Sequence, residues 1–240
     1  MLSGPRLFAE QKQINVFAAA SLSDAMNEIA VAFEERYGIK VNLNLAGSNT
    51  LRLQIEKGVP CDVFISANAQ NVRKLDQLSI IDHNKVTVLL TNRLVIVSEN
   101  DNQRKFQNFD ELILYAKPYL SLADPQTVPA GIYAKEALIN AGLWPYVKDR
   151  VVPAVDVRAA LVQVEMGNIN YGIVYMTDAY ISDKVYYPVY IIPDKYHSRI
   201  EYLACLIQER SDRAAGNLFY EFVKRVEMLN IFQKYGFSTL

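Results

Sequence analysis

The chain has 240 residues, long enough for one large domain or two modest ones. Its hydrophobic fraction of 51% is typical of a globular protein with a buried core, and its net charge of -1 leaves no basic surplus for nucleic acid or an anionic membrane surface. No window reaches the ~18 consecutive apolar residues that a membrane-spanning helix needs.

The N-terminal segment, the two cysteines and the two histidines give further information. Residues 1–13 are too short and polar for a complete signal peptide, and we interpret them as the tail of a leader or an artificial remnant. Cys61 and Cys205 lie in or beside apolar runs, which favours buried thiols, although the sequence leaves a disulfide between them open. His83 and His197 are isolated, so they do not indicate a metal site.

The first predicted elements are a strand and a helix with almost nothing between them. Ile14–Ala19 is a short apolar run that predicts a buried strand. Apolar residues then recur at helical spacing from Leu22 to Phe33, and Ser21 with Asp24 has the spacing of a capping box. So sharp a turn directs the free N–H groups of the helix outward from the carboxyl end of the strand, where open α/β sheets bind anions.

The same alternation continues through the first third of the chain. We expect strands over residues 40–46 and 62–66, and helices over residues 51–58 and from residue 67 to about 78. Gly47, Ser48 and Asn49 are small, cap-forming residue types between the second strand and its helix. This β-α-β-α-β-α order predicts a doubly wound, mostly parallel sheet.

A second series of strands and helices follows. We expect strands over residues 93–98, 119–123, 151–155, 171–175, 186–192 and 200–207. We expect helices over residues 129–140 and 157–166, a short helix after a polar loop near residue 101, and a long or broken helix over Ser211–Gln233. Asp156 is a good cap for the helix after it, and residues 176–178 are again cap types. Two series without a Ser/Gly-rich linker indicate two lobes with a ligand cleft between them.

Four junctions place small or capping residues between a strand and a helix N-terminus. They lie at Ser21, Ser48, Ala130 and Val157. Ordinary helix capping would explain any one of them, so only their recurrence in both halves of the chain favours an anion site.

Other chemistry is less well supported. Serine catalysis at Ser21 or Ser48 would need a base, and no G-x-S-x-G elbow is present. The chain also lacks the lysine and glycines of a P-loop and the G-x-G-x-x-G of a dinucleotide site. The hydroxyl of Tyr175, at the end of a strand, either reaches a cleft or is satisfied in the core. For Arg158, beside Asp156, a local ion pair or a solvated helix face is favoured over an anion clamp.

Five sequence blocks, in order, resemble the periplasmic molybdate-binding proteins of ABC importers: VFAAASLSDAMNEIA, AGSNTLRLQIEKGVPCDVFISAN, ADPQTVPAGIYAKEAL, DVRAALVQVEMG and YGIVYMTDA. The similarity extends from Ile14 to Phe237. It implies a type II periplasmic-binding fold, in which two doubly wound α/β lobes are joined by two crossover strands. Residues 14–91 and 200–240 would form lobe I, and residues 92–199 would form lobe II.

The resemblance also implies how a tetrahedral oxyanion is held. Five residues are implied to supply the donors: Ser21 and Ser48 through their hydroxyl and N–H groups, Ala130 and Val157 through their N–H groups, and Tyr175 through its hydroxyl. They would contact the oxygen atoms of the oxyanion rather than act as direct ligands of its metal. The family pattern is changed at neighbouring positions, without loss of any of the five, at Gly47, Asn49, Cys61 and Asn68.

This resemblance implies a non-enzymatic, monomeric solute-binding protein of the periplasm, or an extracytoplasmic and membrane-associated one. It would need no cofactor, bind molybdate or tungstate, deliver the anion to the transmembrane subunits of an ABC permease, and bind no nucleic acid. A regulatory effector-sensing domain on the same fold is disfavoured, because the sequence has no helix-turn-helix or basic segment.

Overall fold

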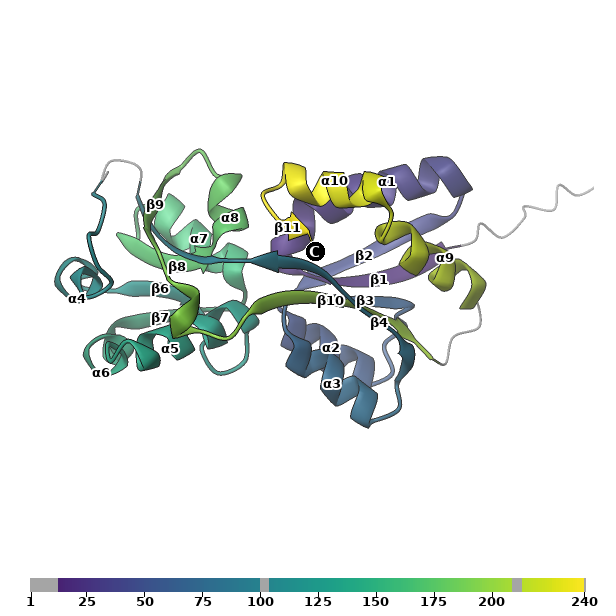
Figure 1. Cartoon of the computed structure of the whole chain (residues 1–240), viewed down its shortest axis with the longest axis horizontal. Coiled ribbons are helices and arrows are strands. Elements are labelled where there is room, and N and C mark those ends of the chain that lie inside the picture. The colour runs from purple at the N-terminus through teal and green to yellow at the C-terminus, as the bar shows by residue number, and fades with distance from the viewer. Residues whose placement is uncertain (1–12, 100–103, 209–212, 240) are drawn as a thin grey trace, which may run out of the picture.

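A computed structural model describes residues 13–99, 104–208 and 213–239. Two β-sheets, each covered by helices on both faces, lie end to end and are joined by extended strands (Figure 1). We refer to the part built on the six-stranded sheet as lobe I and to the part built on the five-stranded sheet as lobe II. Across these described ranges, no helix has both the length and the apolar character to cross a membrane.

The sheet of lobe I has the strand order β11-β4-β10-β3-β1-β2. Its strands are β1 (Gln13–Ala19), β2 (Lys40–Ala46), β3 (Val63–Ser66), β4 (Ile81–Asn92), β10 (Ile200–Ile207) and β11 (Ser238–Thr239). One face is covered by α1 (Ser23–Tyr37), α9 (Arg213–Val223) and α10 (Val226–Lys234), and the other by α2 (Ser48–Glu56) and α3 (Ala69–Gln77) (Figure 1).

The sheet of lobe II has the strand order β7-β6-β8-β5-β9. Its strands are β5 (Leu94–Glu99), β6 (Leu120–Ala123), β7 (Val151–Ala154), β8 (Tyr171–Tyr175) and β9 (Val185–Ile191). The helices α7 (Val157–Glu165) and α8 (Met176–Tyr180) lie on one face and α5 (Pro129–Asn140) on the other (Figure 1). Shorter helices complete the lobe: α4 (Glu111–Tyr115), α6 (Trp144–Val147), η2 (Lys148–Arg150) and η3 (Asp194–Tyr196).

The chain passes twice between the lobes. It first leaves β4 at Asn92 and enters β5 at Leu94, and it returns after β9 through η3 into β10. Figure 1 shows these two passages crossing the middle of the molecule side by side. These crossovers lie close to the boundaries at residues 91/92 and 199/200 that the sequence predicts. The assignment of whole residue ranges to the two lobes remains a prediction.

The predicted apolar face of the first helix is buried in lobe I. Met26, Ile29 and Phe33 of α1 are fully buried. The Phe33 ring centroid lies 5.0 Å from that of Phe219 and 5.3 Å from that of Phe222, both on α9. These aromatic contacts fix the C-terminal helices against the N-terminal one, although nearly two hundred residues separate them.

The α/β architecture is confirmed, but the prediction that the sheet formed by the first strands is mostly parallel is wrong. β1 pairs in parallel with β2 and β3, and β6 with β7 and β8, as the β-α order requires. The strands next to the crossovers run the other way: β10 pairs antiparallel with β3 and β4, and β5 pairs antiparallel with β8 and β9. β4 itself was not predicted, because the polar first half of IDHNKVTVLLTN has no clear period.

Several helix starts differ from the predicted caps. Ser21 lies in a 3-10 turn, η1 (Ala20–Leu22), so Ser21 and Asp24 form no capping box at the start of α1. Met176, Thr177 and Asp178 lie inside α8 instead of preceding it. Asp156, in contrast, caps α7 as predicted, since its Oδ1 accepts a hydrogen bond of 2.9 Å from the N–H of Ala159.

The remaining assignments follow the sequence. The expected C-terminal helix is broken into α9 and α10, while its predicted start at Ser211 lies outside the described residues. The predicted leader or remnant also lies outside them, except for Gln13, and so does the start of the polar loop near residue 101. Cys61 and Cys205 are buried thiols with no disulfide between them, as favoured from the sequence.

Gly131, in the first turn of α5, packs directly on the end of β6. A Cβ atom there would lie 2.0 Å from the carbonyl oxygen of Ala123 and 2.6 Å from that of Asp124. We expect Gly131→Ala to lower the free energy of unfolding by about 1–3 kcal/mol, because the backbone must move to admit the methyl group. Chemical denaturation measures this loss.

Gly216→Ala in α9 is the matched control. There the nearest neighbour of an added Cβ is the side-chain Cβ of Asp62 at 3.2 Å, so a small shift relieves the contact, and alanine favours the helix by about 1 kcal/mol. An equal loss of stability in both variants would contradict the close approach of α5 to β6.

Candidate functional site

A cavity between the two lobes brings together all five residues of the predicted site. The cavity is small, with a volume of about 10 Å³. The lining residues come from both sides of the interface: Ala19, Ala20, Ser21, Gly47, Ser48 and Ala67 from lobe I, and Val128, Pro129, Ala130, Asp156, Val157 and Tyr175 from lobe II. The sequence analysis did not identify Ala67 and Val128 as lining residues, since their types are those of any core position.

Four helices begin at this cavity. α2 starts at Ser48, α5 at Pro129, α7 at Val157 and α8 directly after Tyr175. The N–H groups in the first turn of a helix have no partner within the helix, and the helix dipole makes that end positive. The cavity is therefore lined by backbone donors that favour an anion.

Ser48 contributes a hydroxyl as well as its place at the start of α2. Its side chain is buried, and its Oγ accepts a hydrogen bond of 3.1 Å from the N–H of Ala67, the residue after β3. Because the Oγ is the acceptor in that bond, its hydrogen is available to the cavity. Gly47, one of the predicted capping residues, is the N-cap residue of α2, and no side chain caps this helix.

Ser21 is oriented by a chain of side-chain hydrogen bonds. The oxygen of Ser21 lies 2.9 Å from that of Tyr202 on β10, and the Tyr202 oxygen accepts a bond of 3.1 Å from the Asn92 amide at the crossover. The Asn92 amide also donates to the hydroxyl of Thr177 on α8 at 2.8 Å. With the Asn92 amide as donor, Tyr202 can donate to Ser21, which leaves the Ser21 hydrogen for the cavity.

Tyr175 lines the cavity and carries a buried hydroxyl. The residue is 1% exposed, and its oxygen has no hydrogen-bond partner among the described residues. The alternative of a satisfied core hydroxyl is therefore wrong. Burial raises the pKa of Tyr175 well above its usual value, so the group is a neutral O–H donor at physiological pH. An unsatisfied buried donor is costly, which is consistent with a ligand as its partner.

No lysine or arginine lies among the lining residues given above. The nearest cation in sequence, Arg158, turns away to form ion pairs, with Nη2 at 2.6 Å from Asp24 Oδ2 and Nε at 2.5 Å from Asp178 Oδ1. An ion pair was favoured from the sequence, but its partners are distant in the chain, and the adjacent Asp156 caps α7 instead. Burial raises the pKa of Asp178 to about 7 against the opposing effect of Arg158.

Neither histidine could serve as a base for Ser21 or Ser48. His83 lies at the surface, with its Nδ1 at 3.0 Å from Asp76, and His197 Nδ1 donates to the carbonyl oxygen of Ser198 at 2.8 Å. Neither residue lines the cavity. Within the described part of the chain, no group of His, Cys, Asp and Glu side chains could hold a metal ion.

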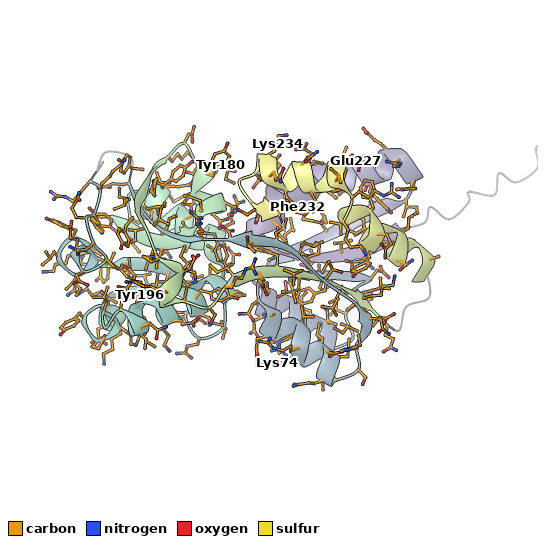
Figure 2. The ribbon with its side chains drawn as sticks, viewed as in Figure 1. Lys74, Tyr180, Tyr196, Glu227, Phe232 and Lys234 are labelled. Atoms are coloured by element: carbon orange, nitrogen blue, oxygen red, sulfur yellow. The ribbon has the colours of Figure 1, made fainter. Side chains whose placement is uncertain are left out.

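The lobes touch each other around the cavity. A Cβ atom on Gly47 of lobe I would lie 3.2 Å from the carbonyl oxygen of Val155 and 3.6 Å from the side chain of Val128, both in lobe II. On the other side of the interface, Gly236 lies against the Tyr180 ring of α8, which Figure 2 labels at the edge of lobe II facing α10. The structure is therefore a closed arrangement.

Comparison with known proteins places this geometry in context. Residues 14–238 match the family described as bacterial extracellular solute-binding protein. The chain is 37% identical to the molybdate-binding protein ModA of Escherichia coli over 96% of this chain and 90% of that protein. It is 34% identical to ModA of Haemophilus influenzae, over 97% of this chain and 92% of the relative.

A solved structure shows the same fold. The periplasmic molybdate-binding protein of Azotobacter vinelandii superimposes with a TM-score of 0.84, covering 95% of this chain and 99% of that one, at 21% sequence identity. The two-lobe α/β arrangement of the type II binding proteins is thus that of this chain.

Tyr175 and Tyr202 face each other in the interface, with ring centroids 6.1 Å apart, but their hydroxyls differ in their partners. We expect Tyr175→Phe to leave the free energy of unfolding of the ligand-free protein unchanged or to raise it, because no protein hydrogen bond is lost. Tyr202→Phe should lower it by about 1–3 kcal/mol, because Asn92 and Ser21 lose their shared partner. Urea denaturation of both variants compares them, and an equally large loss in Tyr175→Phe would indicate a structural role for its hydroxyl.

Proposed function

This chain belongs to the bacterial extracellular solute-binding protein family, whose members bind solutes and are not enzymes, and we propose that its solute is molybdate or tungstate. The anion would lie in the interlobe cavity and contact Ser21, Ser48, Ala130, Val157 and Tyr175. The observation that carries this proposal is the convergence of four helix starts and an unpartnered buried hydroxyl on one cavity without a cation. The names of the relatives agree with it.

Neutral donors explain why such a site would select a fully ionised tetrahedral oxyanion. Every group proposed to contact the anion is an N–H or O–H donor. A protonated oxyanion would direct its own O–H at one of these donors and leave both unsatisfied. Molybdate and tungstate have nearly the same size, so this site should separate them poorly, whereas the smaller sulfate would leave part of the cavity unfilled.

Closing of the lobes would be the signal that a permease reads. Residues 14–91 with 200–240 would move as lobe I and residues 92–199 as lobe II, by rotation at the two crossovers. We propose that the protein is a monomer outside the cytoplasm, in the periplasm or held at the membrane, and that it delivers the anion to the transmembrane subunits of an ABC importer. It needs no cofactor for this task.

Isothermal titration with molybdate, tungstate and sulfate tests the proposed solute. We expect tight binding of molybdate and tungstate with similar affinities, and much weaker binding of sulfate. Micromolar or weaker binding of all three anions would exclude the proposal.

Substitution of the two serines tests the proposed site. Ser21→Ala and Ser48→Ala should each weaken molybdate binding by about 1–3 kcal/mol, the range for hydrogen bonds to charged groups. Ser121→Ala is the matched control, since Ser121 is also buried but its hydroxyl donates to the carbonyl oxygen of Ala160 inside lobe II at 2.8 Å. Unchanged titration curves for both cavity variants would place the site elsewhere.

A further inference from the structure

Arg158 connects the two lobes at the rim of the cavity. It lies in the first turn of α7, directly after Val157, and its side chain reaches across to η1 and α1 of lobe I. There its Nη2 donates to Asp24 Oδ2 at 2.6 Å and to the carbonyl oxygen of Ser21 at 3.4 Å. One side chain thus joins segments that carry proposed anion donors on opposite sides of the cavity.

The same guanidinium is also held within its own lobe. Its Nε lies 2.5 Å from Oδ1 of Asp178 on α8, three residues after Tyr175. The Asp178 side chain is fully buried, whereas that of Asp24 is 44% exposed. Opening of the lobes would therefore separate Arg158 from Asp24 and Ser21, while the contact with Asp178 would persist.

We propose that Arg158 is a positioning residue that couples closing of the lobes to anion binding. Asp178 holds its guanidinium ready in both states, and Asp24 with the Ser21 carbonyl binds it only in the closed state. This inference rests on the proposed function, in which the closed state is the one that retains the anion. A contact made in one of two conformations shifts the equilibrium toward that conformation.

The charges around Arg158 exclude it as the counter-charge of the anion. Two carboxylates already face its guanidinium, one from each lobe, and it does not line the cavity. Its interlobe pair is also partly exposed, so the closed state gains only modestly from it. A modest gain suits this role, because a stronger one would close the empty protein and hinder entry of the anion.

Asp24→Asn tests the coupling without changing any proposed donor. We expect the Kd for molybdate to rise about twofold to fivefold, through faster dissociation rather than slower association, because the closed state loses its interlobe ion pair. Stopped-flow fluorescence and titration separate the two rates. Asp24→Glu keeps the carboxylate and should restore part of the affinity.

Glu28→Gln is the matched control. Glu28 lies one turn further along α1, but it pairs within lobe I, with Lys234 Nζ at 2.7 Å and the Tyr235 hydroxyl at 2.8 Å. Figure 2 labels Lys234 at the end of α10 nearest lobe II, but its Nζ pairs with Glu28 of its own lobe. This variant removes the same kind of charge from the same helix and should leave the Kd unchanged.

A distance measurement separates the coupling from a purely structural role. Both native thiols are buried, so spin labels on Lys74→Cys in lobe I and Tyr146→Cys in lobe II would report the distance between exposed positions. We expect Asp24→Asn to shift this distance distribution toward the open state, with and without molybdate, while Glu28→Gln leaves it unchanged.

The outcomes distinguish the two proposals. Wild-type protein that binds none of the oxyanions would overturn the proposed function, and the distances in the ligand-free protein would still decide the role of Arg158. Wild-type protein that binds molybdate, together with Asp24→Asn of unchanged Kd, dissociation rate and distances, would overturn the coupling alone. An equal effect of Asp24→Asn and Glu28→Gln would also overturn it.

Discussion

The structure depends on one constraint: backbone N–H groups at helix starts must face one another across the lobe interface. A free helix N-terminus is satisfied by water, a cap or a ligand, so burying four of them at one cavity requires partners. The parallel β-α units supply the geometry, because α2, α7 and α8 begin directly after β2, β7 and β8. Each of these helices therefore starts at the carboxyl end of a strand of its sheet. The lobes face each other with these strand ends and helix starts.

Much of this edge could be predicted from the sequence, because strand ends and helix starts are encoded locally. The bounds of β8, the start of α5 at Pro129 and the Asp156 cap of α7 all follow from neighbouring residues. The antiparallel pairing of β4 and β10 could not be predicted, since it joins strands more than a hundred residues apart. The resemblance to a known family, rather than periodicity, selected the five site residues from many equivalent cap types.

The roles of individual polar side chains were harder to predict than the elements that carry them. Ser21 and Asp24 have the spacing of a capping box, yet Ser21 bonds to Tyr202 and Asp24 to Arg158. In both cases a partner from a distant part of the chain replaces the local backbone as the hydrogen-bond partner, because the tertiary structure brings the two groups together. The local spacing of residues shows which hydrogen-bond partners a side chain could have, and the tertiary structure decides which of them it takes.

Gly47 allows the two lobes to approach each other closely beside the cavity. The lobes meet at this residue, where even a methyl group would press on the carbonyl oxygen of Val155. The absence of a side chain at Gly47 therefore helps to set the spacing between the helix starts of the two lobes. A bulkier residue at position 47 would hold the two lobes further apart and enlarge the cavity, while the proposed donor residues stayed the same. The width of the cavity and the type of its donor groups are therefore set by different residues.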